Sequence, residues 1–458
     1  MTTSATTSTS TGSPEDAAPG TPSERPAPFD RSPEPERADR ADRPRRSRWG
    51  LWAQGNFRKL WVGETTSGLG TAVGNVALAL VAVVTLDASP FMVGVLTAAA
   101  WVPWLFLGLL AGAWVDRWPR LKVMLVCDLL LLVLFGSVPV AGWFDALTMA
   151  QLIAVALLAG AAKVFFSTAY GAVLPSLVAK EDLLEANVKL RSGDSAAEIA
   201  GPGVAGLLSQ TFGAASGLLG DAVTYLVSAI CLGTIRVKET PPPVSERRGI
   251  LREIGEGVRF LAGDRYLRTL AVFGTVGNLG LNGIQAVQTV FLVRDVGVSP
   301  GGIGAVFAVV SVGGLAGAAL AGRIARRFGT ARGTLLCELV AAPFLLLLPL
   351  AGTRLPLAVS AVAWSVAVCG VVAGNVLAGS FYQSYCPPAM IGRIRASAST
   401  VNFGAIPVGA LLGGWLGEVL GARTTIWIMA GVLLAAGAVL LVSPLRPLRD
   451  FPERPAAA

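Results

Sequence analysis

The chain has 458 residues, 53% of them hydrophobic and 14% charged, and its mean hydropathy is +0.62. Water-soluble domains carry roughly a quarter of charged residues, so this composition excludes an ordinary soluble domain and indicates an all-α, polytopic membrane protein. The formal net charge of +8 does not indicate nucleic-acid binding, because the basic residues gather in alternate loops between apolar segments. The chain has no histidine, which excludes histidine-based catalysis, proton relays and metal sites.

The first 47 residues are rich in Ser, Thr, Pro, Glu, Asp and Arg. A segment of this composition cannot bury a core, and it lacks the apolar stretch of a signal peptide. We therefore expect residues 1–47 to form a disordered cytosolic tail. A regulatory or lipid-contacting role for the basic residues at 43–48 is the alternative to a simple spacer.

The apolar segments that follow predict twelve membrane-spanning helices, six in each of two bundles. Each segment supplies the roughly 20 residues that cross a 30 Å hydrocarbon layer. The N-terminal bundle occupies residues 48–236 and the C-terminal bundle residues 266–446, followed by a cytosolic tail at 447–458. A cytosolic linker at 237–265 contains an amphipathic segment from Ile250 to Leu261. The predicted crossings are about 58–86, 91–115, 121–143, 147–171, 194–212, 215–236, 267–293, 299–322, 333–352, 356–382, 396–417 and 423–444.

A charged segment between two apolar runs occurs twice in the chain. The stretch from Gly112 to Lys122 is matched 210 positions later by the stretch from Gly322 to Arg332. The starts of the two bundles, Phe57-Arg-Lys-Leu60 and Leu267-Arg-Thr-Leu270, have the same offset. Internal duplication of this size is typical of transporters built from two parallel repeats. Because Lys and Arg fill alternate loops, the positive-inside rule places both termini in the cytosol.

Four motifs carry a family resemblance. They are Phe57-Arg-x-Leu-Trp-x-Gly63, the loop from Gly112 to Lys122, Phe166-x-x-Ala-Tyr-x-Ala172 and Pro388-x-x-x-Gly-Arg-Ile394. Together they resemble the major facilitator superfamily, and within it the exporter branch similar to macrolide-efflux proteins and the enterobactin exporter. The resemblance implies the twelve-helix fold, a place in the plasma membrane and transport by alternating access. Two departures are Pro119, where the family has glycine, and Arg326, where the first copy has Asp116.

The loop after the second predicted helix is a candidate gate. Asp116 would lie at the cytosolic end of that helix, where it can pair with Arg117, Arg120 or a helix N-terminus of the other bundle. Contacts formed in only one of two arrangements bias a rocking equilibrium. Alternatively, the basic residues only fix the topology. The candidate gating residues are Gly112, Asp116, Arg117, Arg120, Arg326 and Arg327.

Polar residues recur along one face of the first and the seventh predicted helices, at spacings of three and four. Exposing such a face to lipid is costly. The family resemblance implies that these helices border a central cavity, to which the tenth helix adds two amides. Hydrogen bonds that merely hold the bundle together are the alternative. The candidate substrate and cavity residues are Glu64, Ser67, Thr71, Asn75, Asn278, Asn282, Gln285, Asn375 and Gln383.

Without histidine, proton coupling requires carboxylates. Glu64 is the first candidate, because it belongs to the polar face of the first helix and has no basic neighbour in sequence. Asp221, in the outer third of the sixth helix, is the second. The other intramembrane charges are expected to form structural ion pairs. These are Asp128 and Glu338, each with the basic loop before it, and Lys163 with Asp194 or Glu198.

The sequence therefore predicts a proton-coupled exporter of a small amphiphilic molecule of the drug, macrolide or siderophore class. The chain has no Gly-x-x-x-x-Gly-Lys phosphate-binding motif, so ATP is not expected to drive transport. We expect no enzymatic activity, cofactor, metal, disulfide or nucleic-acid partner, and we expect a monomer whose partners are the substrate, H⁺ and the lipid bilayer. A nutrient importer with the same fold and a non-transporting membrane sensor or scaffold are the alternatives.

Overall fold

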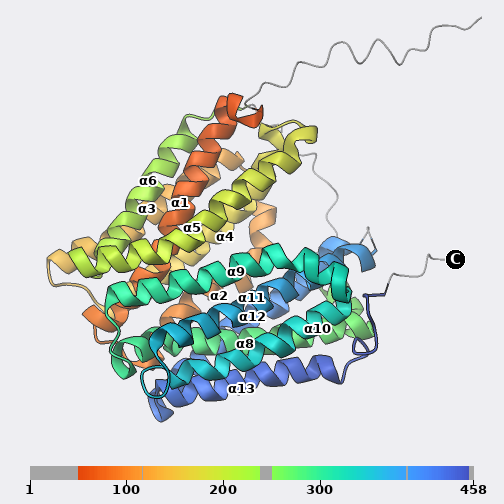
Figure 1. The fold of residues 1–458 in the computed structure, drawn as a ribbon. Coiled ribbons are helices and arrows are strands. Elements are labelled where there is room, and N and C mark those ends of the chain that lie inside the picture. Colours follow the sequence, from red (N-terminus) through yellow and green to blue (C-terminus); the bar gives the residue numbers. More distant parts are fainter. Residues whose placement is uncertain (1–49, 116, 238–249, 388–389, 453–458) are drawn as a thin grey trace, which may run out of the picture. The chain divides into compact units, whose positions relative to one another are not determined.

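The computed structural model describes residues 50–115, 117–237, 250–387 and 390–452 (Figure 1). These residues form helices, and the only extended pairing among them is an isolated bridge between Ala351 and Leu355. The all-α membrane architecture expected from the composition is therefore confirmed. The predicted N-terminal tail, Asp116 and residues 238–249 of the linker lie outside the described residues.

The first bundle consists of six long helices. They are α1 (Gly55–Leu80), α2 (Pro90–Val115), α3 (Arg120–Trp143), α4 (Met149–Leu177), α5 (Leu183–Phe212) and α6 (Ser216–Gly233). α1 packs against α5 and α6, while α4 packs against α2 and α3. The hydroxyl of Thr148 accepts a hydrogen bond from the backbone nitrogen of Gln151 and so caps the start of α4. α5 ends at Gly213, whose φ of +88° favours glycine.

The second bundle repeats this arrangement after a short linker helix. Its elements are α7 (Ile250–Gly263), α8 (Arg265–Val290), α9 (Pro300–Phe328), α10 (Thr330–Ala341), its 3-10 continuation η5 (Ala342–Leu350), α11 (Leu357–Tyr385), α12 (Ile391–Leu420) and α13 (Ala422–Leu441). The linker helix α7 corresponds to the amphipathic segment expected from the sequence, and it packs against α12 and α8. Asp264 ends the linker, and its carboxylate accepts hydrogen bonds from the backbone nitrogens of Tyr266 and Leu267. This cap starts α8.

Eleven helices of the described residues are long and apolar enough to cross a membrane. α5 is not among them because its first half carries charges, among them Lys189, Arg191 and Asp194. It nevertheless has 30 residues, packs along α1 and corresponds to α12 in the repeat. α5 is therefore the twelfth crossing of the fold.

The repeat has a register that changes once along the chain. α1 and α8 begin 210 positions apart, at Gly55 and Arg265. Each continues into a π-helical turn at the same offset, η2 (Val81–Thr85) and η4 (Phe291–Asp295). α4 and α11, and likewise α5 and α12, are 208 positions apart at both ends. The second bundle is thus shorter by two residues between its third and fourth crossings.

The helix ends define two faces of the protein. We call the side where α1, α3, α5, α8, α10 and α12 begin the basic face, because Arg and Lys crowd the connections there. We call the other side, where α2 and α9 begin, the opposite face. The termini of the described region, Gly50 and Pro452, belong to the basic face.

The two bundles meet closely at the opposite face. α2 packs against α12, and α5 packs against α9, whose ribbons also lie next to each other in Figure 1. A Cβ on Gly206 of α5 would lie 2.8 Å from the Cα of Gly304 of α9, and a Cβ on Gly94 of α2 would lie 2.6 Å from the carbonyl oxygen of Ala410. Glycine therefore permits backbone-to-backbone contact at both crossings. Further along α2, towards the basic face, a Cβ on Gly112 would meet no described atom within 4 Å.

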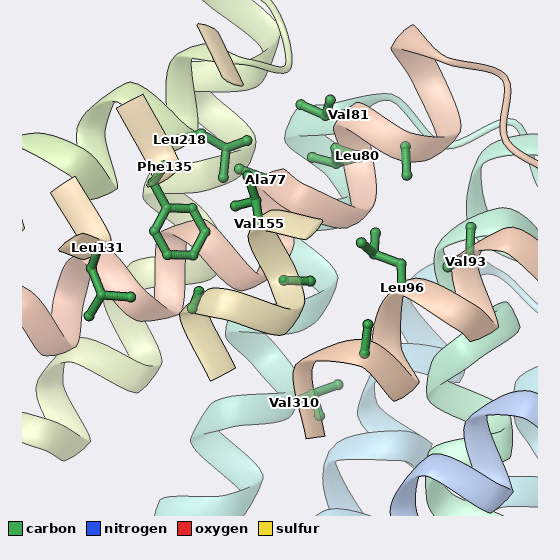
Figure 2. Close-up of a cluster of buried hydrophobic side chains, with 14 of the residues drawn as sticks. Ala77, Leu80, Val81, Val93, Leu96, Leu131, Phe135, Val155, Leu218 and Val310 are labelled. Atoms are coloured by element: carbon green, nitrogen blue, oxygen red, sulfur yellow. The ribbon is translucent and has the colours of Figure 1, made fainter. Parts of the chain in front are cut away.

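The packed interior consists of aliphatic and aromatic side chains from both bundles (Figure 2). In lipid, close packing rather than exclusion from water holds such helices together. The side chains labelled in Figure 2 include Ala77 of α1, Leu96 of α2, Phe135 of α3, Val155 of α4, Leu218 of α6 and Val310 of α9. Since Val310 belongs to the second bundle, the same cluster continues across the contact between the bundles.

The chain beyond α13 folds back onto the basic face of the second bundle. The Asp450 carboxylate accepts a hydrogen bond from the backbone nitrogen of Thr330 at 2.9 Å, at the start of α10. The ring of Phe451 stacks on Phe381 of α11 with centroids 4.5 Å apart. In the predicted cytosolic tail at 447–458, the chain up to Pro452 therefore packs against the second bundle, and residues 453–458 lie outside the described residues.

Candidate transport site

Two carboxylates lie fully inside the first bundle. Asp128 of α3 and Asp221 of α6 have 0% exposure, and among the described residues their side-chain oxygens have no hydrogen-bond partner. An ionised carboxylate in such a place is costly, whereas a protonated one is far less so. These two groups are therefore suited to gain and lose a proton.

Asp221 occupies a slot made by two glycines of α1. Cβ atoms added to Gly70 or Gly74 would collide with the carboxylate oxygens of Asp221. The neighbouring Thr224 hydroxyl donates to the Asp221 backbone carbonyl at 2.7 Å and leaves the carboxylate alone. The absence of side chains at Gly70 and Gly74 thus positions an acid between α1 and α6.

A lysine on α4 completes the surroundings of Asp221. The Lys163 ammonium lies 5.6 Å from the centroid of the Phe135 ring. The charged group with which it interacts electrostatically is the Asp221 carboxylate. Phe135 stacks on Tyr225 at 5.9 Å, and the Tyr225 hydroxyl shares a 2.9 Å hydrogen bond with Thr71. Among the described residues no ion pair within 4.0 Å joins Lys163 to any carboxylate, so the cation and Asp221 face each other without a direct bond.

This arrangement corrects the expected pairing of Lys163. Asp194 forms its ion pair with Arg191 at 3.6 Å, one turn away on α5. Glu198 lies exposed one turn further along α5, where Asp194 and Arg191 are the charges that act on it. The rotation of α4 turns Lys163 towards α3 and α6 and away from α5.

Glu64 lies between the buried acids and the more exposed ones. It is partly buried, and its Oε1 atom has no hydrogen-bond partner in the part of the chain that the structure describes. Asp128 and Asp194 are the charges that act on it. Asp194 in turn lies beside α1, with an oxygen 3.9 Å from where a Cβ of Gly68 would be. Glu198 is thus exposed, Asp194 and Glu64 are partly buried, and Asp128 is fully buried.

The expected ion pairs of Asp128 and Glu338 with the basic loops are also corrected. Arg120 donates to the carbonyl oxygen of Ala172 on α4 at 3.2 Å, and Asp128, two turns further along α3, lies beside Ser228 of α6. Glu338 lies against α11, with its Oε1 atom 2.8 Å from where a Cβ of Gly374 would be. In the described ranges neither acid forms an ion pair, because each is turned towards a neighbouring helix.

The polar faces expected to line a cavity separate into two groups. Ser67 and Thr71 lie inside the first bundle, and Asn282 is buried and donates to the carbonyl oxygen of Asn278, one turn earlier on α8. The repeat-equivalent pair Asn75 and Gln285 is exposed. Three further candidates differ in exposure: Asn278 is partly buried, and Asn375 and Gln383 of α11 are exposed.

The candidate gating loop lies only partly within the described residues. Asp116, its proposed central residue, lies outside them. Arg117 is exposed and, together with Trp114 and Trp118, borders an open surface hollow of about 360 Å³. In the second copy Arg326 and Arg327 are exposed as well, and the Arg327 guanidinium lies 5.6 Å from the Phe328 ring. The gating role of Asp116 and its neighbours stays a prediction.

Two charged residues at the opposite face were not among the predicted site residues. The Arg294 guanidinium forms an ion pair with the Asp87 carboxylate at 2.5 Å and donates to the Ala88 carbonyl oxygen at 2.9 Å. This contact joins the end of the π-helical turn after α8 to the connection after η2. A signal existed in the sequence, because the connections on this face carry few charges.

Comparisons with known proteins agree with this architecture. Residues 46–457 match the family described as a transmembrane secretion effector. The multidrug efflux pump Tap of Mycolicibacterium fortuitum is 27% identical over 386 residues, which cover 81% of this chain and 90% of that protein. The enterobactin exporter EntS of Escherichia coli O9:H4 (strain HS) is 28% identical over 295 residues, covering 63% of this chain and 67% of EntS.

Solved transporter structures have the same fold. A variant of the nucleoside transporter NupG superposes with a TM-score of 0.73 at 13% identity, over 84% of this chain and 99% of that one. A bacterial homologue of the iron transporter ferroportin, in an inward-facing state, superposes with a TM-score of 0.68 at 17% identity, over 84% of this chain and 98% of that one. Identities this low carry information about the fold alone.

Proposed function

The chain belongs to the transmembrane secretion effector family of major facilitator transporters, and we propose that it is a proton-driven exporter of small amphiphilic molecules. Export is supported by the relatives that match most of the chain, a multidrug efflux pump and, over a shorter stretch, an enterobactin exporter. The substrate class we propose accordingly is that of drugs, macrolides and siderophores. The transporter acts as a monomer in this proposal.

We place the basic face in the cytosol of a cell with this chain in its plasma membrane. The concentration of Arg and Lys on that face follows the positive-inside rule. Both termini are then cytosolic, and the opposite face is extracellular. Because the close glycine contacts between the bundles lie at the opposite face, we assign the structure to an inward-open state.

The observation that carries proton coupling is the pair of buried carboxylates in the first bundle, which have no hydrogen-bond partner among the described residues. Asp221 faces the Lys163 ammonium, the charge that acts on it, so a proton and the lysine can neutralise the same acid in turn. Glu64 interacts electrostatically with Asp128 inside the bundle and with Asp194 beside α1. We propose that Asp221 binds the coupled proton and that Glu64 carries it between Asp221 and the cytosolic side.

The uncharged amides exposed on the pseudo-symmetric helices suit a hydrogen-bonding, largely neutral substrate. Asn75 of α1 and Gln285 of α8 occupy equivalent places in the two repeats, and Asn375 of α11 is exposed as well. We propose that these amides contact the substrate in the space between the bundles. The buried members of the polar faces, such as Ser67 and Asn282, stabilise the helices instead.

Reconstitution tests the proposal. Purified protein in liposomes receives an imposed pH gradient, and uptake or release of a labelled macrolide, a catecholate siderophore and a cationic dye is followed. We expect at least one of these compounds to move in the direction opposite to the proton flow. A protonophore that collapses the pH gradient should stop this movement. Transport of the same compound at equal rates with and without the gradient would contradict proton coupling. Accumulation of the compound in intact cells that make the protein would show import instead of export.

A further inference from the structure

The first helix of each bundle ends in the same unusual way at the opposite face. The π-helical turns η2 and η4 lie 210 positions apart. After each turn the chain reverses through matching backbone hydrogen bonds that span six residues, from the Ala88 nitrogen to the Ala82 oxygen at 2.9 Å and from the Val298 nitrogen to the Leu292 oxygen at 2.8 Å. π-helical turns are rare in proteins, and those that occur are frequently found at functional sites.

The two reversals differ in one residue. At the turning point the second bundle has Gly297 with φ of +75°, whereas the first bundle has Asp87 with φ of +47°. Glycine adopts this left-handed conformation readily, and an aspartate does so at a cost. A non-glycine residue held in such a conformation points to a role for its side chain.

The side chain of Asp87 meets the other bundle. Its carboxylate pairs with the Arg294 guanidinium at 2.5 Å, and the same guanidinium donates to the Ala88 carbonyl oxygen at 2.9 Å. Arg294 lies in η4, so the contact joins the ends of the two repeat-equivalent helices. Its own repeat equivalent is Val84, so the first bundle supplies the acid and the second supplies the base.

A second polar contact between the bundles lies on the same face. The Glu418 carboxylate, near the end of α12, accepts a hydrogen bond from the backbone nitrogen of Phe91 at the start of α2, at 3.4 Å. Anions are favoured at a helix N-terminus. Both contacts exist only while the bundles are together at the opposite face, and both must break when that face opens.

We propose that the Asp87–Arg294 ion pair stabilises the closed arrangement of the opposite face and thereby sets the share of protein that is open to the other side. This role of the pair rests on the transport function proposed above. It involves neither the acids proposed to bind the proton nor the amides proposed to contact the substrate. Its expected size is modest because Asp87 is 91% exposed and Arg294 33% exposed in their side chains. Exposed pairs of this kind change an equilibrium by about two- to five-fold.

The test measures the opening of the opposite face directly. Phe212, at the end of α5, and Arg354, before α11, are exposed on that face in different bundles. Cysteines at these two positions, in a background whose five native cysteines are replaced, carry spin labels, and pulsed dipolar spectroscopy in lipid nanodiscs yields the distance distribution. We expect Asp87→Asn to raise the population with the long distance, relative to the population with the short distance, by about two- to five-fold. Asparagine tolerates the left-handed conformation, so the substitution changes the charge and keeps the turn.

A double-mutant cycle separates the pair from other effects. Arg294→Gln alone should act like Asp87→Asn, and the double substitution should open the face no further than Arg294→Gln, because either change breaks the same bond. The matched control is Asp145→Asn, an exposed aspartate with φ of +52° on the same face, which should leave the distances unchanged. Additive effects in the cycle, or an Asp87→Asn protein with unaltered distances, would overturn the proposal.

Failure of the ion pair can be told apart from failure of the proposed function. Distances are measured without substrate or pH gradient, so a protein that opens more after Asp87→Asn but moves none of the tested compounds supports the ion pair and removes the exporter assignment. Proton-driven export together with unchanged distances would support the exporter function and contradict the proposed role of the ion pair.

Discussion

The two bundles have the same arrangement of helices and differ in the charged residues that they carry. The first bundle places Glu64, Lys163, Asp194 and Asp221 in or beside its interior. At the repeat offsets the second bundle has Gly274, Val371, Asn402 and Met429 in their places. Each bundle keeps one buried acid at the repeat offset, Asp128 in the first and Glu338 in the second. The concentration of the other ionisable groups in the first bundle supports the proposal that proton binding belongs to that bundle and that the second is its partner in the rocking motion.

The difference is sharpest where the first and sixth crossings meet. In the first bundle the Asp221 carboxylate lies against Gly74 of α1. In the second bundle the Met429 sulfur lies against Gly283 of α8, which is one residue before Ile284, the repeat equivalent of Gly74. In both bundles a glycine of the first crossing leaves room for the side chain at this position of the sixth crossing, and that side chain is an acid in one bundle and a thioether in the other. The chemistry at this contact therefore differs through a single side chain.

Replacing Asp221 tests the comparison most strongly. We expect Asp221→Asn to lower proton-driven transport by at least about 10-fold, which corresponds to about 1.4 kcal/mol on the limiting step, because asparagine cannot bind and release a proton. The matched control is Glu338→Gln, a buried acid of the second bundle, which should retain most of the transport. A proteoliposome assay that found Glu338→Gln inactive and Asp221→Asn active would reverse the assignment of the bundles.

Filling the glycine slot tests the geometry. Gly74→Ala should lower the free energy of unfolding by about 1–3 kcal/mol, because the added methyl group overlaps the Asp221 carboxylate and forces the helices apart. Thermal denaturation in detergent measures the loss. Asp221→Ala in the same protein should recover stability, and Gly171→Ala, where a Cβ meets no described atom within 4 Å, serves as the control. A Gly74→Ala protein as stable as the parent would show that α1 and α6 do not approach this closely.

Converting the first site into the second separates stability from function. Lys163→Val with Asp221→Met gives the first bundle the side chains that the second carries at these places. Replacing buried charges by apolar groups of similar size is often neutral or stabilising, so we expect the doubly substituted protein to denature within about 1–2 kcal/mol of the parent while pH-driven transport disappears. Lys163→Val alone should be less stable than the double substitution, since it leaves Asp221 without its cation. Retained pH-driven transport in the double substitution would contradict the role of this pair.

Much of the fold was predictable because hydropathy and length are local properties. The apolar runs, the linker helix and the repeat of the loop at Gly112 follow directly from the residues in each stretch. The rotation of each helix about its axis was not predictable in this way. Asp128 faces α6 rather than the basic loop, and Lys163 faces α3 rather than α5, because glycines and tertiary packing set these orientations.

The contacts between the bundles were even less accessible to sequence reasoning. Asp87 and Arg294 are 207 positions apart and differ from their own repeat equivalents, so neither spacing nor duplication connects them. The polar stripes were recognised by their helical period, but only the structure divides Thr71, bonded to Tyr225 inside the bundle, from the exposed Asn75. A period identifies a face of a helix and does not say what that face meets.

The smallest predicted effect concerns the helix that follows the repeated loop in each bundle. α3 begins after Pro119 without a side-chain cap, whereas α10 begins at Thr330, whose backbone nitrogen donates to the Asp450 carboxylate at 2.9 Å. Losing a cap of this kind costs about 1 kcal/mol, so we expect Asp450→Ala to lower the denaturation midpoint slightly.

The control is Arg449→Ala, because the contribution of that residue to the Arg332 nitrogen comes from its carbonyl oxygen and survives the substitution. A C-terminal segment that only rests on the surface would give equal midpoints for both variants. A difference confined to Asp450→Ala would mean that the second bundle, which has no equivalents of the interior Lys163 and Asp221, draws part of its stability from the chain that follows it.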